Sequence, residues 1–174
     1  MTGLDEKADR ILEVAVVITD MNFAILEEYH RIIFQPPEVI ENMNDWCKKT
    51  HGESGLTALI PQGTPLANVD KELGEVIIRH FGPAEKVVLV GNSVGNDKRF
   101  IDAYMPLVAK RLHYRLIDVS SFKEIFREKY GLGFAKANGH RAVDDIHESI
   151  RELSFYLSYV SVPTKSEPPV QQKK

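Results

Sequence analysis

The stretch Lys86-Val87-Val88-Leu89-Val90-Gly91-Asn92-Ser93-Val94-Gly95-Asn96-Asp97 decides the fold that we expect for this 174-residue chain. Residues 86–90 form a short, mostly apolar run, which is typical of a strand buried on both faces. The small and amide residues of 91–97 then predict a turn that opens a helix through Phe100, Ile101 and Tyr104. A strand, a loop and a helix in this order are the building unit of an α/β sheet.

The segments on either side of this unit extend the sheet. Two β-branched runs, 10–19 and 23–34, are joined by Asp20-Met21-Asn22, whose turn chemistry predicts an antiparallel hairpin. A second strand is expected over 114–119. Apolar spacing predicts helices over 38–50, 66–81, 122–130 and from Ala142, with a loop over 51–56 and a cap at Ser120-Ser121. The predicted buried stripe of the last helix is Ala142, Ile146, Ile150, Leu153, Leu157 and Val160. The sequence thus predicts an α/β fold with a mixed sheet.

Composition limits the class of protein. With 43% hydrophobic and 27% charged residues, the chain has the make-up of one globular domain, expected over 1–162, followed by a disordered tail over 163–174. The net charge of −3 argues against a broad basic face for long duplexes. Cys47 is the single cysteine, which favours an intracellular setting. No run approaches the roughly 18 apolar residues of a membrane span.

Three side chains carry the expected chemistry. Asp97 follows the strand 86–90, at the kind of strand end where α/β proteins gather ligands. Asp145 lies in the first turn of the last helix, on the shoulder of its predicted apolar stripe, whereas Asp144 points almost opposite. His140 precedes that helix and could approach the same pocket as a proton-transfer partner. The competing interpretation is that the acid serves the helix dipole and the histidine is ordinary surface.

Carboxylates suit Mg²⁺ or Mn²⁺ together with substrate phosphate oxygens. Two such ions, about 3.5–4 Å apart, would activate a water molecule and stabilise the leaving oxygen of a phosphodiester. That arrangement needs about four carboxylates, and the sequence assigns only Asp97 and Asp145, with Asp118 possible but without a positional argument. The loop 91–97 matches neither the P-loop nor the dinucleotide fingerprint.

Several segments of the chain together form a specific pattern. They are 1–5, Asn44-Asp45-Trp46 with Thr50-His51 and Ser54-Gly55-Leu56, 91–97 with Arg99-Phe100, His113-Tyr114-Arg115 with Asp118-Val119-Ser120, and 140–145 with Glu148-Ser149. In this order and spacing they resemble the oligoribonuclease family of DEDDh exonucleases. The resemblance implies an RNase H-like sheet, Mg²⁺ or Mn²⁺, a homodimer, and hydrolysis of very short RNA, down to dinucleotides, from its 3′ end. It also implies that Asp97 and Asp145 bind metal and that His140 is the general base.

The same resemblance assigns substrate contacts. Leu4 would wedge between the two bases, and Trp46 would stack on or support the 3′ nucleotide. The 5′ phosphate would be capped by His51 and Ser93, together with Tyr114 and Arg115 of the second protomer. Such a cap would exclude longer RNA, because a continuing chain would collide with the capping groups.

The sequence departs from the family at its start. Family members open with a strand that ends in Asp-x-Glu directly before the Met-Thr-Gly-Leu element, and this sequence begins at that Met. We therefore expect the first central strand to be missing and the chain as given to be impaired or inactive. Two alternatives remain open: a non-catalytic oligonucleotide-binding or dimerisation module, and a DNA exonuclease of the proofreading type. The compartment is expected to be cytoplasmic or mitochondrial, without a membrane partner.

Overall fold

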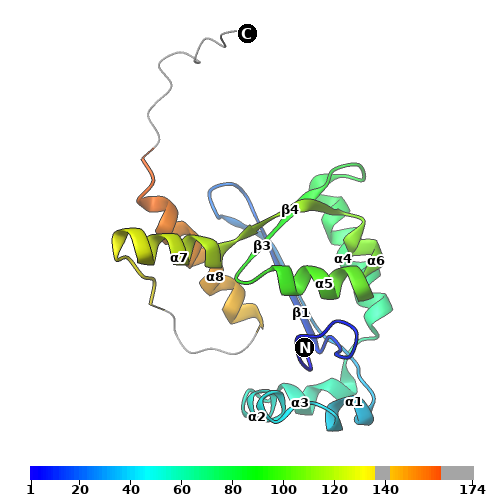
Figure 1. Ribbon diagram of the computed structural model, residues 1–174. Helices are drawn as coiled ribbons and strands as arrows, with labels where there is room; N and C mark the ends of the chain where they lie inside the picture. The colour runs from blue at the N-terminus through cyan, green and yellow to red at the C-terminus, as the bar shows by residue number, and fades with distance from the viewer. Residues whose placement is uncertain (136–141, 162–174) are drawn as a thin grey trace.

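The computed structural model describes residues 1–135 and 142–161, and the expected tail over 163–174 lies outside them. The described residues form a mixed α/β fold (Figure 1). The strands are β1 (Glu13–Thr19), β2 (Ile25–Ile32), β3 (Val87–Gly91) and β4 (Leu112–Asp118). The helices are α1 (Pro37–Glu41), α2 (Asp45–Glu53), α3 (Leu56–Leu59), the 3₁₀ turn η1 (Ile60–Gln62), α4 (Leu66–Phe81), α5 (Gly95–Tyr104), α6 (Pro106–Ala109), α7 (Val119–Tyr130) and α8 (Ala142–Ser158). None of the described helices is both long and apolar enough to cross a bilayer.

The predicted hairpin is confirmed, with β1 and β2 paired antiparallel. The Asp20 carboxylate closes the turn by accepting the backbone N–H groups of Asn22 at 2.8 Å and Ala24 at 2.9 Å. Phe23 takes a left-handed conformation with φ 66°. Asp side chains bond the backbone two residues on, and this stabilises tight links between strands.

The strand β3 pairs parallel with β4, which brings Gly91 opposite Asp118. The expectation that this strand is buried on both faces was wrong, since Val88 is 43% and Val90 is 45% exposed. Alternate residues of a strand share one face, so one face of β3 is open to solvent. Within the described residues, β1–β2 and β3–β4 are separate two-stranded sheets.

Three local predictions were wrong because the helices begin and end at other residues than the sequence indicated. The expected helix 38–50 is two helices, since the Asn44 side chain accepts the Cys47 N–H at 2.8 Å and starts α2 afresh. That helix runs to Glu53, so His51 is helical instead of lying in a loop. The cap of α7 is Asp118, which accepts the Ser120 N–H at 2.9 Å.

The long helix α4 was predicted with its correct bounds, and it packs its apolar side into the main core. This core also takes in Ile18 and Tyr29 of the hairpin and Phe100 of α5. A second cluster lies under α2 and α3 and consists of Leu12, Met43, Cys47, Leu56 and Ile60. In Figure 1, α1, α2 and α3 form a group beside the N-terminal loop.

Helix α8 is described from Ala142 to Ser158, and its predicted buried stripe is confirmed at Leu153 but not at its C-terminal end. Leu157 and Val160 are 38% and 50% exposed, whereas Glu152 and Tyr156 are fully buried. The helix packs against both α7 and β1. The Tyr156 ring lies 4.9 Å from the Phe126 ring of α7, centroid to centroid. The aromatic contact with α7 therefore rotates α8 away from the orientation that aliphatic spacing alone predicts.

Candidate active site

The carboxyl ends of β3 and β4 meet at one edge of their sheet. The Ser93 backbone N–H, just beyond β3, donates to Asp118 Oδ1 at 3.0 Å and to Ser120 Oγ at 3.0 Å. Ser93 adopts φ 51°, so its N–H turns toward the start of α7. Parallel strands place their following loops together, which is where ligands bind in α/β proteins.

Asp97 lies in the first turn of α5, directly beyond this edge. Burial raises the pKa of its carboxyl, and the neighbouring Asp118 adds to the rise. The residue nevertheless keeps an exposed surface. An accessible carboxylate in a poorly solvating environment is open to a cation.

Asp145 lies in the first turn of α8 and is exposed, as is Asp144. The start of this helix is anchored on β1, where Glu13 Oε2 accepts the Ala142 N–H at 3.4 Å. Glu13 is buried and its Oε1 lies 2.8 Å from His30 Nε2. The general base expected from the sequence, His140, lies outside the described residues.

Burial lowers the pKa of the Met1 amino group, while the electrostatic effects of Cys47, Glu13 and Asp97 act in the opposite direction.

Asp97 and Asp145 are accessible carboxylates of the kind that divalent metal ions bind. Over residues 1–135 and 142–161, no group of three or more His, Cys, Asp and Glu side chains is arranged to hold a metal ion. Magnesium is commonly bound through one or two carboxylates, with water and substrate phosphate supplying the other oxygens. Asp97 and Asp145 suit that mode of binding, and when bound such an ion would polarise a phosphoryl oxygen and lower the pKa of bound water.

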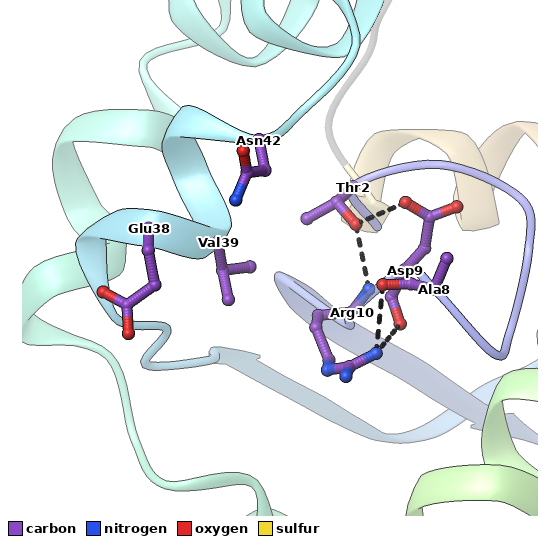
Figure 2. A pocket seen from close by; sticks show the side chains of 7 residues that line it. All are labelled: Thr2, Ala8, Asp9, Arg10, Glu38, Val39 and Asn42. Carbon is purple, nitrogen blue, oxygen red and sulfur yellow. Dashed lines mark hydrogen bonds between the residues drawn. The ribbon is translucent and has the colours of Figure 1, made fainter.

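The loop 1–10 carries Leu4, whose side chain is 63% exposed. Figure 2 shows how this loop is held. Thr2 Oγ1 donates to Asp9 Oδ1 at 2.8 Å and accepts the Arg10 N–H at 2.9 Å, beside a cavity of about 150 Å³. The guanidinium of Arg99, in α5 with Asp97, donates to the Leu4 carbonyl at 3.3 Å. The loop therefore presents Leu4 to solvent near α5.

Helix α2 carries Trp46 and His51. Trp46 is 66% exposed, so it is a surface residue and not part of the core. His51 is half-buried, and its Nε2 lies 2.9 Å from the Met1 carbonyl oxygen, while its Nδ1 is buried and has no hydrogen-bond partner among residues 1–135 and 142–161. Burial lowers the pKa of the imidazole, despite the opposing effect of the Met1 carbonyl.

An aromatic and basic patch lies on β4. Tyr114 is 76% exposed, its ring stacks on His113 at 4.5 Å between centroids, and the Arg115 guanidinium lies 5.3 Å from the ring centre. Exposed aromatic and cationic side chains of this kind are suited to a base, a phosphate or a partner surface.

Ser93 and Asp118 thus lie at the same edge of the β3–β4 sheet. Arg99 links Leu4 to α5, the helix that carries Asp97. Trp46 and His51 both lie on α2. Sequence reasoning left Asp118 without a role. Its place at the end of β4, the strand that pairs in parallel with β3, was the available signal.

Comparison with known proteins identifies the family. Residues 1–153 match the exonuclease family model RNase_T. The chain is 47% identical over 166 residues to the human protein named mitochondrial oligoribonuclease, covering 92% of this chain and 70% of that protein. A bovine protein of the same name is 46% identical over 165 residues, with the same coverage. An oligoribonuclease of Francisella tularensis is 43% identical over 159 residues, covering 90% of this chain and 89% of that protein. The family is dependent on divalent metal ions. With its RNase H-like exonuclease domain, the chain belongs to the oligoribonuclease family of 3′→5′ exoribonucleases.

Proposed function

We propose that the protein hydrolyses very short RNA, dinucleotides above all, to mononucleotides from the 3′ end, with Mg²⁺ or Mn²⁺ as the cofactor. The observation that carries this proposal is 43–47% identity, over nine-tenths of the chain, to proteins named oligoribonuclease. The accessible acids Asp97 and Asp145 support it as oxygen ligands. The phosphate oxygens of the substrate would supply further ligands.

The roles of the individual groups are those that the family resemblance implies. Asp97 and Asp145 would hold the metal at the scissile phosphate, and His140 would accept a proton from the attacking water. Leu4 and Trp46 meet the bases, because both are large, exposed apolar groups on the surface. His51 and Ser93 cap the 5′ phosphate. The Ser93 hydroxyl is exposed and can donate to an oxyanion.

We further propose that the protein acts as a homodimer, in which Tyr114 and Arg115 of one protomer complete the phosphate cap of the other. The exposed Tyr114 ring with its neighbouring guanidinium supports this proposal. Sedimentation equilibrium should give twice the chain mass, and Tyr114→Ala combined with Arg115→Ala should shift the protein toward the monomer. We place the protein inside the cell, in keeping with relatives named mitochondrial.

A second function, binding of oligonucleotides without cleavage, is favoured by one observation. The described residues supply two candidate metal acids and no preformed group of three, whereas the two-ion mechanism requires more ligands.

One experiment separates these functions. The purified chain is incubated with a 5′-phosphorylated RNA dinucleotide and Mn²⁺, and both binding and release of mononucleotides are measured, with Asp97→Asn as the control. Release that is lost in Asp97→Asn supports the exoribonuclease. Binding without release supports the binding module, and neither binding nor release contradicts both. Faster cleavage of long single-stranded DNA than of the dinucleotide would point to the DNA exonuclease instead.

A further inference from the structure

The loop 1–10 is closed near its two ends by its own residues. The Thr2 N–H donates to the Arg10 carbonyl at 2.9 Å, and Thr2 Oγ1 accepts the Arg10 N–H at 2.9 Å. The Asp9 carboxylate fills the inside of the loop and accepts the Thr2 hydroxyl at 2.8 Å (Figure 2). A Cβ atom on Gly3 would lie only 2.3 Å from Asp9 Oδ2, so this close approach requires glycine. A compact loop whose ends adjoin and whose own side chains fill it is an Ω-loop.

Tyr104, the last residue of α5, holds this loop from outside. Its hydroxyl donates to the Glu6 carbonyl at 2.7 Å and to the Asp9 carbonyl at 3.0 Å, and it accepts the Arg10 guanidinium at 2.7 Å. A phenol has a single proton, so the two carbonyls share it while the guanidinium uses a lone pair of the oxygen. The ring is half-buried against the main core, which fixes the hydroxyl in place. One side chain of α5 therefore contacts three residues of the loop.

Arg99, in the middle of α5, reaches the exposed part of the same loop. Its Nη2 donates to the Leu4 carbonyl at 3.3 Å, and its Nε lies 3.6 Å from the Glu6 carboxylate. The same Nη2 donates to Asn96 Oδ1 at 2.8 Å, within α5, and this contact orients the guanidinium. Because Arg99 and Tyr104 belong to one helix, they hold the backbone of Leu4 at a fixed place relative to α5.

The Leu4 side chain is left free by these contacts, since they involve only the backbone and the neighbouring residues of the loop. It is 63% exposed. A group that is held in its binding position before the ligand arrives avoids the loss of affinity that accompanies ordering of a loop on binding.

We propose that Tyr104 and Arg99 are positioning residues that hold Leu4 where it meets the two bases of the substrate, and that they thereby favour a dinucleotide over a mononucleotide. A mononucleotide has no second base for Leu4 to meet. This inference rests on the proposed function for the contact between Leu4 and the bases, whereas the contacts between α5 and the loop are a property of the chain. A Tyr104 with a purely structural role would affect the binding of both ligands alike.

The first measurement follows the loop without a ligand. Lys7 is exposed in the loop, and trypsin cleaves after it when the loop opens locally. Tyr104→Phe removes only the hydroxyl, and we expect it to speed cleavage after Lys7 by about fivefold to tenfold, because the stabilisation of about one hydrogen bond is lost. Tyr29→Phe is the matched control, since the Tyr29 hydroxyl donates to Glu72 at 3.0 Å between β2 and α4. It should be cleaved after Lys7 as the wild type is.

The second measurement compares the affinities for a 5′-phosphorylated RNA dinucleotide and for the corresponding mononucleotide, by isothermal titration calorimetry in EDTA, which prevents metal-dependent cleavage. Tyr104→Phe and Arg99→Ala should each weaken dinucleotide binding by about threefold to tenfold. Mononucleotide binding should be unchanged. In a Leu4→Ala background, Tyr104→Phe should cause little further loss, because both changes act through one contact.

Equal cleavage after Lys7 in Tyr104→Phe and Tyr29→Phe would overturn the proposal. An equal loss of affinity for the two ligands, or a full further loss in the Leu4→Ala background, would also overturn it. If the wild type hydrolyses the dinucleotide with Mn²⁺ and Tyr104→Phe binds it unchanged, the proposed function is supported and this inference is wrong. If dinucleotide binding depends on Tyr104 and the wild type releases no mononucleotide with Mn²⁺, the positioning role is supported and the proposed hydrolysis is contradicted.

Discussion

The Asp118 carboxylate accepts the backbone N–H of Ser93 at 3.0 Å and so ties the end of β4 to the end of β3. The same Oδ1 accepts the Ser120 N–H at 2.9 Å and caps α7. One acid thus fixes both the loop that precedes Asp97 and the helix beside α8.

Removal of this carboxylate should destabilise the protein. Asp118→Ala is expected to lower the free energy of unfolding by about 1–2 kcal/mol, because a helix cap and a loop contact are lost together. Urea unfolding followed by circular dichroism measures the change. Glu124→Ala, at an exposed position of the same helix, should change stability by no more than about 0.5 kcal/mol. Equal losses in the two variants would contradict the capping role.

His51 should make stability depend on pH. Its pKa is lowered by burial from the usual 6.5, so between the lowered value and 6.5 the unfolded chain binds more protons than the folded one. The free energy of unfolding should therefore fall as the pH is lowered through this window. His51→Gln should flatten that slope in urea unfolding measured between about pH 5.5 and pH 7.5, one unit on either side of the usual histidine pKa. His113→Gln removes a histidine elsewhere and is the matched control; an unchanged slope in His51→Gln would refute the assignment.

The Asp97 carboxylate should lower the stability of the metal-free protein and should be needed for metal binding. Because its pKa is raised, the folded state favours the protonated acid, and stability is lost as the pH rises from the usual 3.8 through the raised value. Asp97→Asn should therefore raise the melting temperature at neutral pH in EDTA, while abolishing stabilisation by added Mn²⁺. Differential scanning calorimetry with and without Mn²⁺ tests both parts. A lower melting temperature in EDTA would show that the carboxylate is well accommodated without a cation.

Trp46 should contribute to binding and little to folding. With 66% of its surface exposed, Trp46→Ala should leave the melting temperature nearly unchanged. Loss of stacking on a base should weaken dinucleotide affinity by about 1–3 kcal/mol. Fluorescence anisotropy of a labelled dinucleotide measures the affinity. Phe34→Ala removes another exposed aromatic, 44% exposed, and should leave affinity as it is; the same loss in both variants would argue against a specific stack.

The sequence predicted most of the secondary structure because the spacing of apolar residues and the residues that begin and end each element indicate the same bounds. Helix α4 shows this, since Pro65 precedes it, Gly82 follows it, and Val69, Leu73, Val76 and Ile77 recur on one face. The hairpin is a second case, with Asp20 in its turn. Here local chemistry and tertiary packing favour the same answer.

The predictions were wrong where contacts between elements distant in the sequence determine which side chains are buried. The orientation of α8 depends on Phe126 meeting Tyr156, and aliphatic spacing cannot register a contact between two helices. The buried Glu152 was missed for the same reason, because its donors Asn92 and Tyr156 come together only in the fold. Of the site, Asp97 was found by its place after a strand, whereas Asp118 occupied the equivalent place and received no role.

The central proposal is that Asp97 and Asp145 are both ligands of divalent metal ions. Titration of Mn²⁺ into the wild type, Asp97→Asn and Asp145→Asn, followed by electron paramagnetic resonance, tests it most directly. The proposal predicts that each change weakens Mn²⁺ binding by at least about tenfold, because each removes a carboxylate ligand. Unchanged Mn²⁺ affinity in either variant would contradict the account.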